Sequence, residues 1–129
     1  MSDAFDSDVL IYAANDVSIA PQIQALIESA PHAIGSLLLL PETLSKPVRQ
    51  ANTCEEEAVA RLLKRLDLKP VDVEVADAAT VFAAKYRLRA VEAIHLATAV
   101  VWGAERFHTN NRKHFGPHIT EVEVVWPEG

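Results

Sequence analysis

The sequence predicts an α/β fold in which helices cover both faces of a mainly parallel sheet, giving a three-layer α/β/α sandwich. Short apolar runs alternate with segments whose apolar residues recur at helical spacing. Strands and helices that alternate in this way are typical of a parallel sheet with helices on both faces. The 129 residues contain no internal repeat and no low-complexity linker, so we expect a single domain over residues 1–129.

The first half of the chain is expected to form two buried strands and three helices. Val9–Tyr12 is short, apolar and partly β-branched, and His32–Gly35 is a second apolar run. Pro21 suits the first turn of a helix and Pro31 ends it. The helices are expected over residues 19–29, over 37–45 with Ser36 as cap and Pro41 as a perturbation, and over 53–66 with Thr53 as cap.

The second half is expected to form three strands and two helices. Val71–Val75 alternates strictly between apolar and acidic residues, which predicts a half-exposed strand. The segment 91–102 is apolar nearly all round, which predicts a buried helix that stops at Gly103. The remaining elements are a helix over 77–86 and short strands over 106–108 and 122–126.

Composition limits the classes of function. The net charge is −6, and this balance argues against a broad phosphate-binding surface, although a local cation can still supply positive charge at a small site. No apolar run reaches the roughly 18 residues that a membrane span needs, and the acidic N-terminus lacks a signal-peptide pattern. Cys54 is the only cysteine, which excludes an internal disulfide. We therefore expect a cytoplasmic protein with no membrane segment.

Three carboxylates lie inside or beside apolar runs. They are Asp6, at the start of the first expected strand, Glu42 after four leucines and a proline, and Glu92 in the apolar helix. A carboxylate is costly to bury alone, whereas several that converge can hold a hard divalent cation. In parallel α/β sheets, ligands bind beyond the carboxyl ends of the strands. Metal-dependent phosphodiester chemistry is the hypothesis that follows, although a solvated or helix-capping role also fits each residue taken alone.

Polar neighbours can support these carboxylates. Ser7 can donate a hydrogen bond to Asp6, and Asp8 adds a second carboxylate. Thr109 and Asn111 follow a short strand and can orient a water or a ligand, or simply form a turn.

Three further residues near these positions have alternative interpretations. Arg112 and Lys113 are either surface charges or contacts to an RNA backbone. His95 is either a hydrogen-bond partner of Glu92 or a core histidine; a metal ligand is the less favoured reading, because hard cations prefer oxygen.

Four segments in this order resemble the PIN-domain family, and most closely its small toxin ribonucleases of the VapC type. They are FDSDVLIYA, PETL, EAIHLATAV and RFHTNN, and the resemblance covers nearly the whole chain. Asp6 corresponds to the first aspartate of the family and Glu42 to its glutamate. Glu92 stands where the family usually has aspartate, and Asn111 where many members have a further aspartate.

The resemblance implies a metal-dependent endoribonuclease whose Asp6, Glu42 and Glu92 hold Mg²⁺ or Mn²⁺. It also implies an RNA substrate and a cognate antitoxin. Separately, the apolar side chains of the 37–40 region and of the 53–66 helix are expected to seat either the second copy of a homodimer or an antitoxin helix. The longer Glu92 and the uncharged Asn111 leave a second hypothesis open, a weakened or inactive module that binds RNA or an antitoxin. A small-molecule phosphatase is less favoured, because no glycine-rich phosphate loop or nucleophile motif is present.

Overall fold

The computed structural model describes residues 2–127, which form a five-stranded sheet and six helices. The strands are β1 (Ser2–Phe5), β2 (His32–Ser36), β3 (Asp67–Lys69), β4 (Arg106–His108) and β5 (Glu123–Val125). The helices are α1 (Ser7–Asn15), α2 (Ala20–Ser29), α3 (Leu39–Arg49), α4 (Thr53–Leu63), α5 (Val73–Tyr86) and α6 (Ala90–Val101). The strand order is β3-β2-β1-β4-β5 and every neighbouring pair is parallel, which confirms the predicted fold class.

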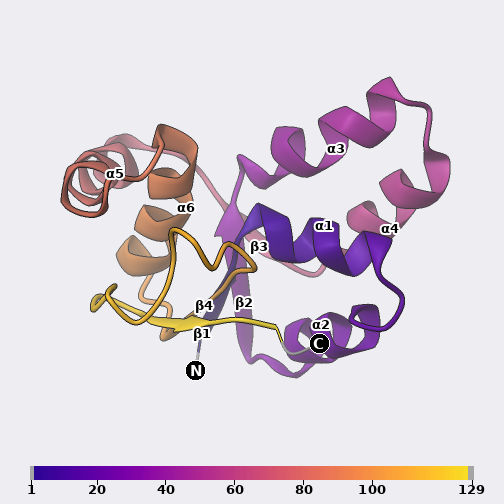
Figure 1. The fold of residues 1–129 in the computed structure, drawn as a ribbon, viewed down its shortest axis with the longest axis horizontal. Coiled ribbons are helices and arrows are strands. Elements are labelled where there is room, and N and C mark those ends of the chain that lie inside the picture. Colours follow the sequence, from indigo (N-terminus) through magenta and orange to yellow (C-terminus); the bar gives the residue numbers. More distant parts are fainter. Residues whose placement is uncertain (1, 128–129) are drawn as a thin grey trace.

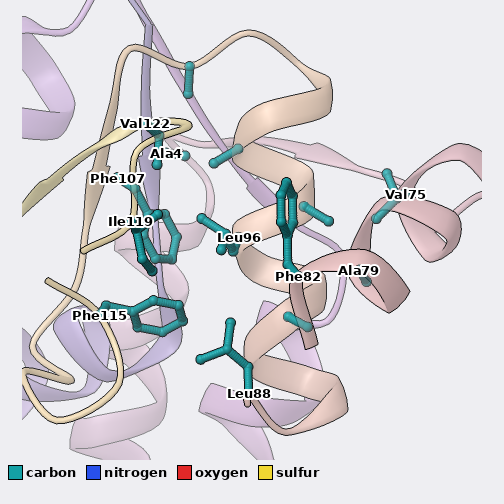
Figure 2. Close-up of a cluster of buried hydrophobic side chains, with 14 of the residues drawn as sticks. Ala4, Val75, Ala79, Phe82, Leu88, Leu96, Phe107, Phe115, Ile119 and Val122 are labelled. Atoms are coloured by element: carbon teal, nitrogen blue, oxygen red, sulfur yellow. The ribbon is translucent and has the colours of Figure 1, made fainter. Parts of the chain in front are cut away.

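Helices cover both faces of the sheet, with α5 and α6 on one face and α1 to α4 on the other (Figure 1). Successive side chains of a strand point to opposite faces, so Ala4 packs in the α5/α6 core and Phe5 in the other core. Figure 2 shows the α5/α6 core, in which Leu96 lies between Phe82 on the helical side and Phe107 on the side of the sheet. Two cores on one sheet hold the strand ends in fixed positions.

The first predicted strand, Val9–Tyr12, is wrong, because this run lies inside helix α1. Val9, Leu10 and Ala13 are buried at helical spacing, and a short apolar run does not by itself distinguish strand from helix. The first strand instead covers Ser2–Phe5. Asp6 therefore lies at the carboxyl end of a strand and caps the following helix, where it had been expected at the start of a strand.

The predicted strand Val71–Val75 is also wrong. Asp72 is the N-cap of α5, and its side chain accepts a hydrogen bond from the backbone N–H of Val75 at 3.0 Å. A capping aspartate satisfies a backbone donor that the first turn leaves free, so it favours the helix over the alternating pattern. The third strand is Asp67–Lys69, just before this helix.

Two predicted caps are corrected in the same way. Asn52 caps α4 in place of Thr53, because its side chain accepts from the N–H of Glu55 at 3.1 Å. Ser36 ends β2 and its hydroxyl accepts from the N–H of Leu38 at 3.1 Å, so it shapes the turn before α3 without being the cap.

Two helices and three short strands were predicted within a few residues of their observed bounds. They are α2, α6, β2, β4 and β5. α3 begins two residues later than expected, so that Pro41 falls in its first turn, and α4 ends three residues earlier. Gly103 has φ +72°, a left-handed conformation that favours glycine, directly after the end of α6. Among residues 2–127, no helix has the length and apolar character to cross a membrane.

Candidate functional site

One cleft collects most of the residues that the sequence singled out. It lies beyond the carboxyl ends of β1 and β4, two neighbouring strands of the sheet, and beside the first turns of α1, α3 and α6. Its open volume is about 450 Å³. The lining residues are Asp6, Ser7, Asp8, Glu42, Arg89, Val91, Glu92, His95 and Asn111.

Asp6 is fixed at the centre of the sheet edge. Its backbone N–H donates to the carbonyl of His108 at 2.9 Å, which extends the pairing of β1 with β4. Its carboxylate accepts from the N–H of Ser7 at 2.8 Å and from the hydroxyl of Thr109 at 2.9 Å. The residue is only 4% exposed. Asp6 thus has one fixed orientation and little contact with water.

Asp8 brings a second carboxylate next to the first. Its Oδ1 accepts from the backbone N–H of Asn110 at 3.0 Å and faces the hydroxyl of Thr109 at 3.2 Å. Thr109 has one hydroxyl hydrogen, so it serves Asp6 or Asp8 but not both fully. Burial, and then the negative charge of Asp8, raise the pKa of Asp6 to about 7. Burial also raises the pKa of Asp8.

Glu92, unlike Asp6 and Asp8, has hydrogen-bond donors at both carboxylate oxygens that outweigh the effect of burial. It is the third residue of α6, and its Oε1 accepts from the backbone N–H of Arg89 at 2.9 Å in a capping arrangement. Its Oε2 accepts from the side-chain amide of Asn111 at 2.9 Å, with the ring of His114 at 3.3 Å. Burial disfavours the charged form, but these hydrogen bonds outweigh it and hold the pKa of Glu92 below its ordinary value.

Glu42 enters the cleft from the first turn of α3 and contacts His95. The Nε2 of His95 hydrogen-bonds Oε1 of Glu42, so His95 is the partner of Glu42 and not of Glu92 as the sequence had suggested. His95 lines the cleft although it was not among the expected site residues. The signal available in the sequence was its spacing from Glu92, because residues three apart lie on one face of a helix.

The loop after β4 holds the last two expected residues. The backbone N–H of Asn111 donates to the hydroxyl of Thr109 at 3.0 Å, which closes the turn around the Asp6 side of the cleft. Oδ1 of Asn111 accepts from the N–H of His114 at 3.2 Å. Asn111 therefore donates an amide hydrogen to Glu92, which an aspartate carboxylate at this position could not do.

The basic residues expected to contact RNA do not line the cleft. Arg112 donates to the carbonyl of Pro127 at 2.7 Å and lies over the ring of Trp126, and Lys113 is exposed nearby. Arg89 does line the cleft, and its side chain is 83% exposed. It was missed because the sequence shows it only as one of several clustered basic residues, with nothing to indicate which of them faces the acidic groups.

The donor set fits one hard cation with an incomplete protein shell. Within the described part of the chain, no three His, Cys, Asp or Glu side chains converge closely enough to hold an ion by themselves. The carboxylates of Asp6 and Asp8 both lie within hydrogen-bond distance of the Thr109 hydroxyl, at 2.9 Å and 3.2 Å. Mg²⁺ is commonly held by one or two carboxylates and keeps several waters, and carboxylates also suit Mn²⁺. Burial and the charge of Asp8 raise the pKa of Asp6 against the opposing effect of His95, so added positive charge would stabilise the ionised pair.

Comparison with known proteins agrees with the fold. The family model of the PIN domain matches residues 4–116. No curated protein matches the chain. Two solved structures share the fold. A toxin–antitoxin complex from Klebsiella pneumoniae has 24% identity and a TM-score of 0.73, covering 94% of this chain and 98% of that one. VapBC2 from Rickettsia felis, bound to a DNA fragment from its promoter, has 15% identity and a TM-score of 0.79, covering 99% and 100%.

Proposed function

The chain belongs to the PIN-domain family, and we propose from this that it is a cytoplasmic, metal-dependent endoribonuclease of the VapC type, the toxin of a toxin–antitoxin pair. The observation that carries the proposal is that Asp6 and Asp8 both approach the hydroxyl of Thr109, at 2.9 Å and 3.2 Å, in a cleft that also contains Glu42 and Glu92. Four carboxylates around one small cleft repel one another and repel RNA unless a cation joins them.

Asp6 and Asp8 would hold Mg²⁺ or Mn²⁺ directly, and Glu42 and Glu92 would face the ion across the cleft. When bound, the ion polarises a phosphate oxygen and lowers the pKa of a water for in-line attack. Both oxygens of Glu92 already accept hydrogen bonds, so this residue acts on the ion chiefly through its charge and through water. This is a narrower role than the direct metal ligand that the sequence suggested.

The other lining residues bind and orient the substrate. Among the described residues that line the cleft, Arg89 is the single arginine and there is no lysine. Its exposed guanidinium can pair with a phosphate of the RNA backbone. The side chain of Glu42 is 30% exposed and can accept a proton from the attacking water. Thr109 and Asn111 hold the acidic side chains in place through the hydrogen bonds described above. Arg112 and Lys113 remain candidates for more distant contacts with RNA.

The partner proposal rests on exposed apolar surface. A groove between α1, α2 and α4 is lined by Ala13, Val17, Ala58 and Leu62 and ends at Arg61. Val17 is 89% exposed, and Leu37 just before α3 and Leu40 in its first turn are also exposed. An antitoxin segment with apolar and acidic side chains would suit the groove, and the α3 side is the surface proposed for a homodimer. Both similar structures contain toxin–antitoxin pairs, which favours this assignment.

The test is RNA cleavage by the purified protein with Mg²⁺, with Mn²⁺ or with a chelator. We expect cleavage that needs the metal, a loss of at least about 100-fold in Asp6→Asn, and a smaller loss in Glu92→Gln. Asp77→Asn, at an exposed aspartate of α5 that does not line the cleft, serves as a surface control. Equal cleavage by the wild type and both acidic variants, or cleavage that persists in chelator, would contradict the assignment.

A non-catalytic binding module is the second candidate, and one observation favours it. Asn111 occupies the fourth acidic position, and its amide donates to Glu92, so one of the three expected metal ligands is already hydrogen-bonded within the protein. A bound ion stabilises the native state, whereas a module without a metal site gains nothing. A melting temperature that does not change with millimolar Mg²⁺ or Mn²⁺, together with tight RNA or antitoxin binding, would support this alternative.

A further inference from the structure

The four carboxylates of the cleft are anchored to different extents. Asp6 and Asp8 each accept hydrogen bonds from the backbone and from Thr109, and Glu92 accepts from the backbone and from Asn111. Glu42 differs, because within residues 2–127 its side chain has one hydrogen-bond partner, His95. The placement of Glu42 relative to the other acids therefore depends on one contact.

His95 has the properties of a fixed support. It lies on α6 with its side chain 1% exposed, between the buried residues Leu96 and Ala93 along the helix. Glu42 lies on α3, a helix that packs against α1 and α4 on the other face of the sheet. The Glu42–His95 contact thus links the two helical layers across the cleft.

The hydrogen-bond pattern assigns the ring hydrogen. Nδ1 of His95 is buried and, in the part of the chain that the structure describes, has no hydrogen-bond partner. A hydrogen on Nδ1 would be a buried donor without an acceptor, which is costly. Nε2 carries a hydrogen both in the neutral Nε2-protonated ring and in the charged ring, so in either form it donates to Oε1 of Glu42. Burial opposes the charged form, but the hydrogen bond to Glu42 and the negative charge of Asp6 raise the pKa of His95.

We propose that His95 is a positioning residue, which donates its Nε2 hydrogen to Glu42 and holds the Glu42 carboxylate towards Asp6 and Asp8. This rests on the proposed ribonuclease function. Glutamate has three rotatable side-chain bonds, and a half-buried carboxylate without a partner turns towards water. A displacement of about 1 Å at a reacting group can cost on the order of 100-fold in rate. The role of His95 is to prevent that displacement.

The first experiment is a double-mutant cycle on metal-dependent RNA cleavage. We expect His95→Leu to lower kcat on the order of 100-fold with little change in KM, and His95→Gln to recover much of the loss, because its amide N–H reaches near the position of Nε2. Adding His95→Leu to Glu42→Leu should cause no further loss, since the supported carboxylate is already gone.

The matched control is Thr98→Val. Thr98 is a buried polar residue on the same helix, but its hydroxyl donates to the carbonyl of Ile94 and it does not line the cleft. We expect near wild-type kcat from this variant. Equal losses in Thr98→Val and His95→Leu, no recovery in His95→Gln, or multiplying losses in the His95/Glu42 double variant would each overturn the proposal.

A second readout does not depend on activity. Long-range ¹H–¹⁵N correlation spectra of the metal-free wild type should show a hydrogen on Nε2 of His95, and Glu42→Leu should shift this ring signal and speed the exchange of its hydrogen. If the wild type cleaves no RNA with either metal, the proposed function fails, and these spectra still decide whether His95 holds Glu42. A ring signal that Glu42→Leu leaves unchanged would overturn the contact itself.

Discussion

The two sides of the cleft both carry buried carboxylates, but they shift the pKa of these groups in opposite directions. On the sheet side, burial and the neighbouring Asp8 raise the pKa of Asp6 to about 7. On the α6 side, hydrogen bonds from Arg89 and Asn111 overcome burial and lower the pKa of Glu92. The difference shows that proximity to the cleft does not decide the proton affinity of a carboxylate; the donors around it do.

This contrast separates two roles. Glu92 already has the donors that its negative charge requires, so it stabilises the start of α6 without an added ion. Asp6 and Asp8 share one hydroxyl hydrogen, and the nearby His95 offsets burial and their mutual repulsion only in part, so a proton or a cation is needed to neutralise part of their charge. The sheet side is therefore the half of the cleft that gains most from binding a metal.

The largest expected effect is the pH dependence of stability that Asp6 imposes on the metal-free protein. Its pKa is about 7 in the folded state against an ordinary value of 3.8, so between these values the folded state holds a proton that the unfolded chain has released. The stability that this proton supports is present below about pH 4 and is lost as the pH rises through 7, a change on the order of 4 kcal/mol. Asp6→Asn should remove this loss.

Urea unfolding with chelator at pH 5 and pH 8 measures this effect. Asp6→Asn should be more stable than the wild type at pH 8, and Mg²⁺ should restore much of the wild type's stability there. Asp77→Asn, at an exposed aspartate of α5, is the control and should change little at either pH. If the difference between the wild type and Asp6→Asn were the same at both pH values, the raised pKa would be contradicted.

The next largest effect is expected from Thr109→Val, a change of similar shape. Thr109 is fully buried and its hydroxyl donates to the acidic pair and accepts from the N–H of Asn111. Its loss leaves buried polar groups unpaired, which costs about 1–3 kcal/mol. We expect a greater loss at pH 8 than at pH 5, measured by the same unfolding experiment. A loss no larger at pH 8 would show that the hydroxyl does not support the charged pair.

Asn111→Asp, on the α6 side of the cleft, should lower the free energy of unfolding of the metal-free protein by about 1 kcal/mol. It replaces a donor to Glu92 at 2.9 Å by a second carboxylate, so the metal-free protein should lose stability at neutral pH. The added charge should at the same time tighten Mg²⁺ binding. Thermal melting with and without Mg²⁺ measures both effects. Unchanged melting in chelator together with unchanged Mg²⁺ affinity would mean that Asn111 does not govern Glu92.

The smallest effect, below about 1 kcal/mol, is expected from Glu92→Gln at pH 7. Glutamine can still accept from the N–H of Arg89, but it loses the charge that favours the start of a helix. Because the folded pKa of Glu92 is lowered, its charge stabilises the fold above its ordinary pKa, and this stability is lost as the pH falls through the folded value. The difference between the wild type and Glu92→Gln should therefore shrink towards pH 3, as unfolding curves can establish.

The sequence predicted the fold class and most of the residues that line the cleft. It did not predict the burial and the hydrogen bonds that surround each of them. The order of four short motifs indicated the family. Of the four expected acidic or amide residues, Asp6 follows β1, and Glu42 and Glu92 lie in the first turns of α3 and α6. Val9–Tyr12 and Val71–Val75 were assigned as strands because local apolar patterns do not include the capping by Asp6 and Asp72 that starts each helix.

Contacts between distant segments could not be predicted from local patterns. The pairing of His95 with Glu42 joins α6 to α3, and the hydroxyl of Thr109 reaches Asp6 from the far end of the chain. The exposure of Arg89 towards the cleft likewise depends on how α6 is placed against the sheet. Such features follow from the packing of the two helical layers, which a single sequence does not display.

Titration of Mn²⁺ into the metal-free protein at pH 7, followed by calorimetry in buffers of different ionisation enthalpy, tests the central claim most directly. We predict that the wild type binds the ion at the Asp6–Asp8 pair and releases protons on binding, because the ion displaces the proton that the raised pKa of Asp6 retains. Asp6→Asn should bind far more weakly and release none from this position. Binding of equal strength and equal proton release in both proteins, or no binding in the wild type, would contradict the account.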